Sequence, residues 1–208
     1  MDEPPGFLAV AGFVLAALPS PPAGILEVGA GSGELAAALR SAGYDVVAID
    51  PASESPDVRA VSLHKLEEPA ASFDAAVAVV SLHHVDPLEE SCRHLGAIVR
   101  PGGLLIIDEF DVDRFDEQAA RWLIDARGST LGEEHRDPAG LVAELGEHLH
   151  GFARVRAALD EWFELGEPVR GPYLYRWGLP PGHREPEEKL IATGRLPATG
   201  ARLVGTRR

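Results

Sequence analysis

The stretch Ile25-Leu26-Glu27-Val28-Gly29-Ala30-Gly31-Ser32-Gly33-Glu34-Leu35 decides the fold of this chain. A short, mostly apolar run leads into three alternating glycines, and good helix formers follow them. Glycine has no Cβ, so a turn built from it can take positive φ angles and let a ligand approach the backbone. The helix after such a turn presents unpaired N–H groups at its first residues. The pattern therefore predicts a strand, a ligand-binding turn and a helix.

The residues around this stretch alternate between strand-like runs and helical segments. Such alternation is typical of a parallel sheet that is covered by helices on both faces. Strands are predicted at 24–28, 45–49, 57–63, 74–80 and 104–107. Helices are predicted at 7–18, starting near Pro4-Pro5, at 33–41 and at 87–99.

The last third of the chain has a mixed hydrophobic period. It predicts helices at 115–127, with Asp113 as the cap, and at 138–150. Strands are predicted at 152–163 and 201–207, and the segment 165–183 is rich in Gly and Pro, as loops are. No linker-like stretch divides the chain, so we expect residues 1–208 to form a single domain.

Charge and composition exclude several functions. The 208 residues include 19 Lys and Arg and 33 Asp and Glu, which gives a formal net charge of −14. Such a chain repels nucleic acids and anionic membrane surfaces unless its cations cluster, and along the sequence they do not. The apolar run 7–18 is shorter than the roughly 20 residues of a membrane span, and acidic residues precede it, unlike a secretion signal. Cys92 is the one cysteine, so no internal disulfide forms. We expect a cytoplasmic protein that binds neither nucleic acid nor membrane.

A carboxylate, Asp50, stands at the end of the second predicted strand, seventeen residues past Gly33. An acid there can accept hydrogen bonds from both hydroxyls of a ribose, so the ligand is expected to contain a nucleoside. A dinucleotide loop beginning at Gly29 needs glycine where Glu34 stands, although Gly31-x-Gly33-x-x-Ala36 fits the alanine variant of that motif. Glu27 favours a ligand that carries an ammonium group. NAD(P) therefore stays an alternative to a cationic amino-acid ligand.

Taken together, these residues resemble the class I S-adenosylmethionine-dependent methyltransferases. The resemblance covers about 24–108, in the order and spacing of the family. It is carried by Glu27-Val28-Gly29-Ala30-Gly31-Ser32-Gly33, Asp50, Ser72-Phe73-Asp74, Ser81-Leu82-His83-His84-Val85 and Arg100-Pro101-Gly102-Gly103-Leu104. It implies an α/β fold with a doubly wound, mostly parallel, seven-stranded Rossmann-like sheet whose last strand is reversed. The segments 152–163 and 201–207 would then be its closing antiparallel pair.

The resemblance also implies the cofactor S-adenosylmethionine and a division of the domain. Residues 1–20 would be an N-terminal helix, 24–108 the cofactor-binding half and 109–208 the acceptor-side half. The methionine portion would be held by Glu27, Gly29, Ala30, Gly31 and Gly33. Asp50 would bind the ribose, Pro51 would pack beside the adenine, and Ser81 would lie near the amino-acid end. Where relatives often carry an acid and a small residue that read the adenine, this chain has Ser62 and Leu63.

Two adjacent histidines, His83 and His84, follow the strand at which the family places the transferred methyl group. An imidazole has an ordinary pKa near neutrality, so either ring can take a proton from an acceptor, and His84 is favoured. Alternatively, one histidine lines the cofactor pocket and the other caps the loop before Asp86. Adjacent histidines rarely share an ion well, so no metal site is expected here.

Four acids follow the fifth predicted strand: Asp108, Glu109, Asp111 and Asp113. They are expected to cap and solvate the next helix; the alternative is that they receive a cationic acceptor. With Glu27 and Asp50 they make this sheet edge acidic, which favours a neutral or cationic small molecule. An aromatic group is expected to be ordinary core rather than an acceptor wall; its members are Trp162, Phe163, Tyr173, Tyr175 and Trp177.

The predicted function is methyl transfer from S-adenosylmethionine to an oxygen, nitrogen or carbon atom of a small molecule. One alternative is an NAD(P)-dependent oxidoreductase. The absence of a Tyr-x-x-x-Lys pair from the sequence argues against it. The other is a non-enzymatic S-adenosylmethionine-binding protein, which the unusual Ser62 and Leu63 favour. The short N-terminal segment leaves little material for a lid, so the site is expected to be open or completed by the second subunit of a homodimer.

Overall fold

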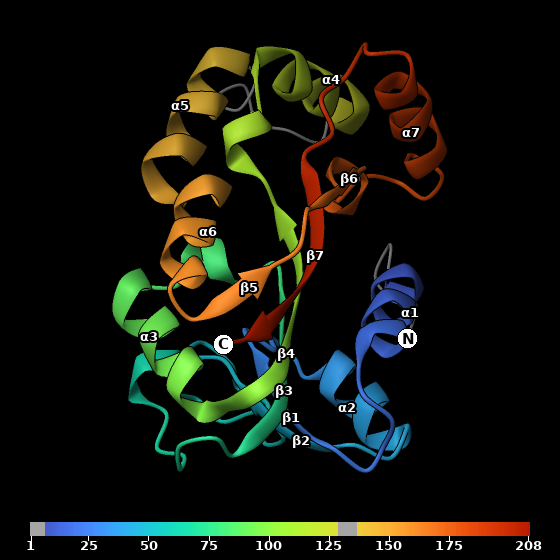
Figure 1. The fold of residues 1–208 in the computed structure, drawn as a ribbon. Helices are drawn as coiled ribbons and strands as arrows, with labels where there is room; N and C mark the ends of the chain where they lie inside the picture. The colour runs from blue at the N-terminus through green and yellow to red at the C-terminus, as the bar shows by residue number, and fades with distance from the viewer. Residues whose placement is uncertain (1–6, 129–136) are drawn as a thin grey trace.

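The computed structural model describes residues 7–128 and 137–208, and within them it contains one mixed seven-stranded sheet (Figure 1). The strand order is β2-β1-β3-β4-β7-β5, and β6 pairs with β7 beside β5. The strands are β1 (Gly24–Val28), β2 (Asp45–Ile49), β3 (Phe73–Val79), β4 (Val99–Phe110), β5 (Phe163–Leu165), β6 (Val169–Gly171) and β7 (Gly200–Arg207). Strands β1 to β4 run parallel, and β7 lies antiparallel to β4, so the predicted reversal of the last strand is confirmed.

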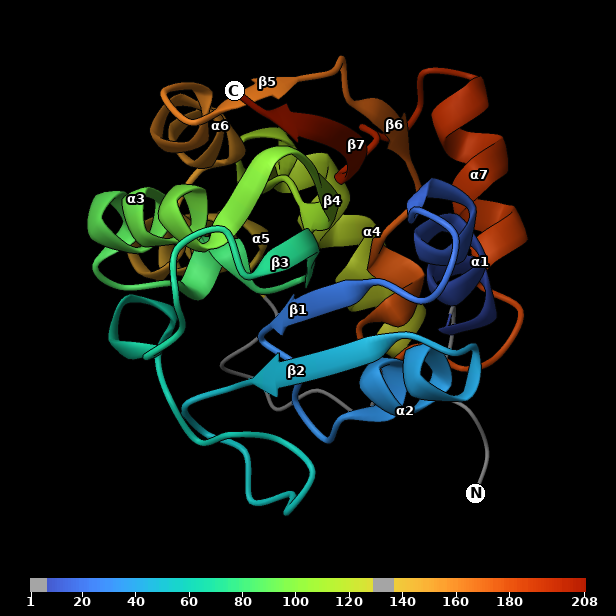
Figure 2. The same ribbon diagram turned by 60° about the horizontal axis from the view of Figure 1, so that its bottom comes forward.

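Helices cover both faces of this sheet, as Figure 2 shows from below. They are α1 (Phe7–Ala17), α2 (Glu34–Ser41), α3 (Leu88–Ile98), α4 (Glu117–Arg127), α5 (Pro138–His148), α6 (Phe152–Asp160) and α7 (Arg184–Ala192). Apolar side chains of α1 and α2 pack on one face, and those of α3 and α6 on the other. Such burial on both sides is why the parallel strands read as continuous apolar runs.

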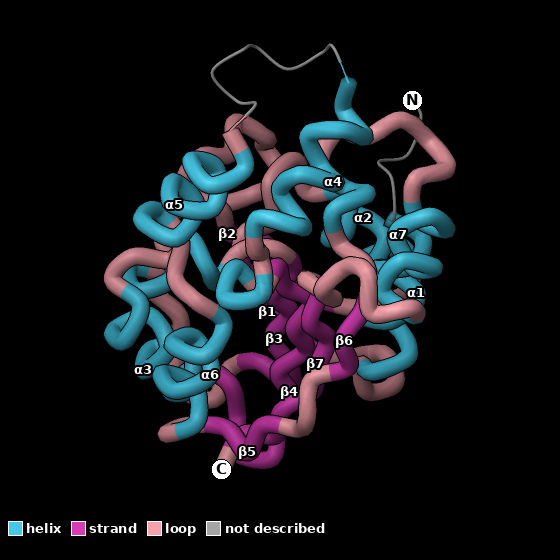
Figure 3. Tube along the Cα trace, turned by 90° about the horizontal axis from the view of Figure 1, so that it is seen from above, coloured by secondary structure: helices cyan, strands magenta, loops and turns pink. Residues whose placement is uncertain are grey.

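A third layer lies beyond the carboxyl end of β4. It contains α4, α5 and α7, which surround the end of the sheet in the view from above (Figure 3). Their apolar side chains join a cluster with Phe110, Phe115 and Tyr173. This cap comes from the part of the chain that follows β4, so the covering of that edge does not depend on the N-terminal segment.

Alternation along β4 separates two consecutive acids. Leu105 and Ile107 pack toward α3 and α6, whereas Ile106 packs toward α1 and α2. Because successive strand residues point to opposite faces, Asp108 faces the α1 side and Glu109 the α3 side. The two carboxylates therefore belong to different sites.

Two segments differ from the sequence prediction. Residues 57–63 form no strand beyond an isolated bridge between Ile49 and Arg59, and the 3-10 turn η1 (Leu63–Lys65) follows. The segment is too polar and exposed to add a buried strand. Residues 152–160 form the helix α6, not a strand, because Phe152, Val155 and Leu159 lie on one helical face against the core. The closing antiparallel pair is therefore β5 and β7.

The helix caps also differ from the prediction. Asp116, not Asp113, caps α4 and accepts a hydrogen bond from the Ala119 N–H at 2.9 Å. Asp113 accepts instead from the Ala153 N–H in the first turn of α6, also at 2.9 Å. Strand β6 lies within 165–183, which was predicted as loop, and helix α7 lies at 184–192, where no element was predicted. The expected helix start near Pro4-Pro5 lies outside the described residues. None of the helices in the described ranges is long and apolar enough to cross a membrane.

Candidate functional site

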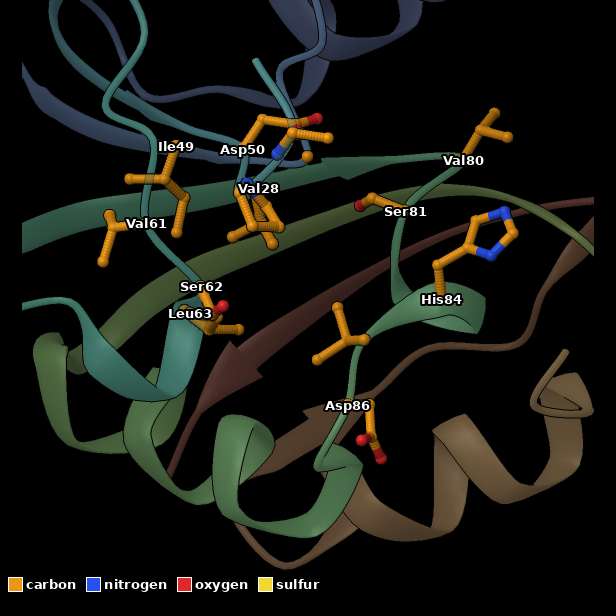
Figure 4. A pocket seen from close by; sticks show the side chains of 14 residues that line it. Val28, Ile49, Asp50, Val61, Ser62, Leu63, Val80, Ser81, His84 and Asp86 are labelled. Carbon is orange, nitrogen blue, oxygen red and sulfur yellow. The ribbon is translucent and has the colours of Figure 1, made fainter. Parts of the chain in front are cut away.

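A cavity of about 310 Å³ opens at the carboxyl ends of β1, β2 and β3 (Figure 4). Seven of the predicted site residues line it: Gly29, Asp50, Pro51, Ser62, Leu63, Ser81 and His84. The other predicted site residues do not line it: Glu27, Ala30, Gly31, Gly33 and His83. Apolar side chains of Val28, Ile49 and Val61 form much of the remaining wall. An apolar slot with a few convergent polar groups is the usual form of a small-molecule site.

The glycine turn links β1 to α2 and is held against β2. The N–H groups of Gly29 and Ala30 both donate to the Ile49 carbonyl, at 2.8 and 3.0 Å. Gly29 has φ +72°, and a Cβ there would lie 2.2 Å from the Ser81 Cβ. Gly31 has φ +54°, and nothing among the described residues lies within 4 Å of the Cβ it lacks. Packing therefore requires glycine at 29, whereas Gly31 leaves open space above the turn.

Asp50 connects the end of β2 to the glycine turn. Its Oδ2 accepts from the Gly31 N–H at 3.0 Å, and its Oδ1 accepts from the Ala52 N–H at 2.8 Å. Each carboxylate oxygen can accept a second hydrogen bond. Asp50 therefore has a fixed orientation at the mouth of the cavity and retains acceptor capacity for a ligand hydroxyl.

Glu27 is buried in β1, on the face toward α2. Its Oε2 has no hydrogen-bond partner among the described residues. Burial raises the pKa of Glu27 to about 7, against the opposing effects of Arg40 and of the Ala36 N–H. A buried carboxylate with an unsatisfied oxygen favours a cationic partner, because the charge otherwise costs free energy.

Ser81 lies where β3 ends and the 3-10 turn η2 (Leu82–His84) begins. Its side chain packs against Gly29, and its buried Oγ has no hydrogen-bond partner in the part of the chain that the structure describes. The preceding residue, Val80, has φ +53°, a conformation that a β-branched residue adopts only under strain. Strain of this kind persists where the surrounding structure fixes the backbone, and here it directs Ser81 into the site.

Glu109 organises this turn, and the sequence prediction missed its role. Its Oε1 accepts from the N–H groups of Ser81 at 2.7 Å and Leu82 at 2.6 Å. Its Oε2 lies 2.5 Å from Nδ1 of His83. Glu109 already accepts two backbone N–H groups, so we assign it as the acceptor in this contact and Nδ1–H of His83 as the donor. Strand alternation could have separated Glu109 from Asp108, but it could not have named His83 as the partner.

The two histidines occupy different environments. His83 is buried, whereas the exposed His84 lines the cavity, and their ring centroids are 4.2 Å apart. Partial burial and the neighbouring His83 lower the pKa of His84; Glu109 raises it, and His150 lowers it further. A neutral imidazole at the mouth of a cavity can accept a proton near neutral pH.

The other acids in and just after β4 do not simply solvate a helix start. Asp108 and Asp111 are buried, as is Glu109, so that prediction is wrong for these three residues. Asp108 pairs with Arg176 and Arg202, and Asp111 pairs with Arg170. These arginines offset the negative charge that the sequence predicted for this edge.

The predicted aromatic group belongs to the core, although Trp162 and Trp177 are only half-buried against it. Phe163, Tyr173 and Tyr175 are buried, and Tyr173 stacks on Phe110 with centroids 5.0 Å apart. Cys92 is also fully buried in α3, and burial raises the pKa of its thiol to about 12. Within residues 7–128 and 137–208, no three His, Cys, Asp or Glu side chains are arranged to hold a metal ion.

Comparisons with known proteins agree with this geometry. Residues 7–152 match a family model described as a methyltransferase domain. The ubiquinone biosynthesis O-methyltransferase of Methylocella silvestris is 39% identical over 95 residues, which are 39% of this chain and 37% of that enzyme. The enzyme of the same name from Azorhizobium caulinodans is 28% identical over 177 residues, 74% of this chain and 65% of that enzyme. The chain thus spans less than two thirds of the length of these two relatives.

The fold is also similar to a solved structure with bound ligands. That structure is the 1,6-didemethyltoxoflavin-N1-methyltransferase of Burkholderia thailandensis, with 1,6-didemethyltoxoflavin and S-adenosylhomocysteine bound. The TM-score is 0.59 at 17% identity, and the match covers 99% of this chain and 79% of the other. This similarity confirms the predicted Rossmann-like fold.

Proposed function

Since the chain belongs to the methyltransferase domain family, we propose that it transfers the methyl group of S-adenosylmethionine to a small-molecule acceptor. The observation that carries the proposal is the 310 Å³ cavity, where the glycine turn, Asp50 and His84 meet at one sheet edge. Ligands of doubly wound α/β folds bind at the carboxyl ends of the strands, where this cavity opens.

The residues present fit this cofactor. Gly31 has free space above it, Asp50 keeps acceptor capacity, and the buried oxygens of Glu27 and Ser81 lack partners among the described residues. The methionine portion would be held by Glu27, Gly29, Ala30, Gly31, Gly33 and Ser81. Asp50 would take the ribose, and the adenine would lie against Pro51, Ser62 and Leu63, beside Ile49 and Val61. When bound, the cofactor supplies an electrophilic methyl group on a sulfonium.

The task of the protein is to position an acceptor and to manage its proton, because in-line displacement gains mainly from orientation. We propose that His84 takes up the proton that the acceptor loses, because its lowered pKa keeps a ring nitrogen free to accept a proton. His83 holds its own proton at Nδ1 against Glu109 and packs beside the His84 ring. Glu109 thereby fixes the turn on which both histidines stand.

The acceptor atom is oxygen, nitrogen or carbon, and oxygen is favoured because the two relatives are named as O-methyltransferases. The acidic balance of the chain favours a neutral or cationic acceptor over a nucleic acid. We also propose that residues 1–208 work as one domain in the cytoplasm. A second subunit could complete the site, although α4, α5 and α7 already cover that edge.

The NAD(P) alternative is less well supported. Helix α2 begins at Glu34, so a carboxylate stands in the first turn of the helix that would face a pyrophosphate. An anion there repels the phosphates that such a helix terminus otherwise attracts. The same carboxylate does not conflict with a cofactor that carries positive charge.

The test is methyl transfer from labelled S-adenosylmethionine to panels of phenols, amines, ring nitrogens and activated carbons. The wild type is expected to label at least one class, and His84→Gln to lower kcat about 100-fold with unchanged cofactor affinity. His148→Gln, an exposed histidine on α5, is the control and should keep full activity. Tight cofactor binding with no transfer to any class would favour the binding-protein alternative.

A further inference from the structure

A second cavity, of about 190 Å³, lies on the opposite face of β4 from the histidines. It is enclosed by β6, β7, the 3-10 turn η6 (Leu174–Arg176) and the start of α7, which lie together in Figure 1. Its volume is about six times that of a water molecule in the liquid. That is enough for a small charged group, and the proposed function assigns nothing to it.

The cavity is positively charged on an acidic protein. Arg176, Arg184 and Arg202 line it, and Asp108 is the acid among the lining residues. The three guanidinium groups outnumber Asp108 by two, and Glu188, which pairs with Arg184, reduces the surplus to one positive charge, whereas the whole chain carries −14. Charges of one sign in a concave site attract ions of the opposite sign.

Arg170 also lines this cavity, but its guanidinium belongs to the other face of the sheet. It lies opposite Ala201 in the β6–β7 register, and Ala201 packs toward α3 and α6. There the guanidinium pairs with Asp111 and lies 5.0 Å from the centre of the Phe152 ring. The surplus charge therefore comes from the other three arginines.

Asp108 holds two of these arginines in place. It accepts two hydrogen bonds from Arg176, at 2.9 and 3.2 Å, and one from Nε of Arg202 at 2.6 Å. Within the described residues, the two terminal nitrogens of Arg202 have no hydrogen-bond partner. The Arg202 guanidinium also lies 5.1 Å from the centre of the Phe13 ring. Its orientation is thus fixed while its donors stay available.

Arg184 is held less tightly. Its Nε donates to Glu188 at 2.8 Å, in an exposed pair one helical turn apart. Exposed pairs of this kind contribute little, so a ligand can compete for the guanidinium. Arg176 and Arg184 both lie near the Tyr175 ring, at 5.6 and 5.7 Å from its centre. The Tyr175 ring therefore lies beside both the loosely held guanidinium of Arg184 and the anchored guanidinium of Arg176.

We propose that this cavity binds the oxyanion group of a small molecule, a carboxylate or a phosphate. The planar guanidinium fork matches the geometry of both groups and binds them through two hydrogen bonds. Asp108 and Glu188 together neutralise two of the three guanidinium groups, so one positive charge remains at the cavity for an anion. The site shares no lining residue with the proposed cofactor pocket.

The test is a titration of the full chain with inorganic phosphate and with succinate, at constant ionic strength and without cofactor. Calorimetry should show saturable binding of at least one probe. Arg184→Gln should weaken it about tenfold, as expected for the loss of a charge-assisted contact. The matched control is Arg121→Gln, because Arg121 forms a comparable exposed pair with Glu117 on α4, and it should bind as the wild type does.

Arg202→Lys is the second variant, because it keeps a positive charge beside Asp108 and lets the chain fold. It should weaken binding as well, because lysine cannot form the two parallel hydrogen bonds of the planar guanidinium. If only phosphate saturates the site, the ligand class is a phosphate ester. If only succinate does, it is a carboxylate. If both do, the site recognises the oxyanion group that the two probes share. No saturation by either probe, or equal affinities in Arg184→Gln and Arg121→Gln, would overturn the proposal. Neither result depends on whether S-adenosylmethionine binds.

Discussion

Glu109 and His83 form a buried pair in which Oε2 of the carboxylate lies 2.5 Å from Nδ1 of the imidazole. Glu109 is 1% exposed and His83 4%. The other oxygen of Glu109 accepts the N–H groups of Ser81 and Leu82. One buried side chain therefore sets the position of Ser81 beside the glycine turn and the orientation of the ring that packs on His84.

Replacing Glu109 should separate folding from catalysis. Glu109→Gln keeps one acceptor for the backbone but presents an amide N–H₂ to Nδ1 of His83, which forces the other tautomer. We expect a folded protein with kcat reduced at least tenfold and a changed pH profile. Glu109→Ala leaves two buried N–H groups without an acceptor and should lower the free energy of unfolding by about 2–4 kcal/mol.

Glu187 offers a matched control for this pair. It is buried too, and its carboxylate accepts the N–H groups of Tyr173, Leu174 and Tyr175 but forms no hydrogen bond with a histidine ring among the described residues. Glu187→Gln should lower the denaturant midpoint much as Glu109→Gln does, with little change in kcat. If both variants lose activity in proportion to stability, Glu109 has no positioning role.

The two glycines of the turn should respond differently to alanine. Gly29→Ala places a Cβ 2.2 Å from the Ser81 Cβ, so it should disrupt the fold, with a loss of several kcal/mol. Gly31→Ala meets no neighbour among the described residues and should cost only about 1 kcal/mol for its positive φ. Its Cβ fills the space above the turn, so cofactor affinity should fall well beyond that cost. Denaturant unfolding and calorimetric titration measure the two effects; unchanged affinity in Gly31→Ala would place the ligand elsewhere.

The raised pKa of Glu27 predicts that the stability of the fold depends on pH. Burial raises its pKa from 4.5 to about 7, so between these values the folded chain binds more protons than the unfolded chain. The contribution of Glu27 is therefore fully present below pH 4.5 and is lost as the pH rises to about 7. The free energy of unfolding should fall by up to about 3 kcal/mol across this window relative to Glu27→Gln.

The carboxylate of Glu27 should also couple cofactor binding to the release of a proton. A cationic ligand favours the ionised carboxylate, so affinity for S-adenosylmethionine should rise as the pH increases through 7. Calorimetry in buffers of different ionisation enthalpy counts the protons released. Glu27→Gln should show neither effect, and an equal pH slope in that variant would assign the proton to another group.

Asp50 should matter for affinity and little for folding. Asp50→Asn removes the charge and one acceptor at the end of β2, so the dissociation constant for S-adenosylmethionine should rise about tenfold. The control is Asp45→Asn, an exposed acid at the opposite end of the same strand. Equal affinities for the two variants would contradict a role of Asp50 in ribose binding.

Local sequence determined much of the fold. The glycine turn could be predicted because its alternating glycines and flanking periods constrain the backbone within a few residues, and the structure has β1, the turn and α2 there. The parallel strands were predictable for a similar reason, since burial on both faces leaves a continuous apolar run. The seven lining residues followed from the resemblance built on these motifs.

Long-range contacts decided the rest. Residues 152–160 fit a strand or a helix by pattern, and the helix is stabilised by Asp113, which lies 40 positions earlier and accepts from Ala153. The role of Glu109 depends on His83, 26 positions away. The pairing of Asp108 with Arg176 and Arg202 joins three segments that only the folded sheet brings together.

Ligand-dependent unfolding tests the central claim most directly. The unfolding midpoint should be measured with S-adenosylmethionine, S-adenosylhomocysteine, NAD and NADP in parallel. A ligand at 100 times its dissociation constant adds about 2.7 kcal/mol, so the first two should raise the midpoint by several degrees and the nicotinamides should leave it unchanged. A rise with NAD or NADP alone would contradict the account.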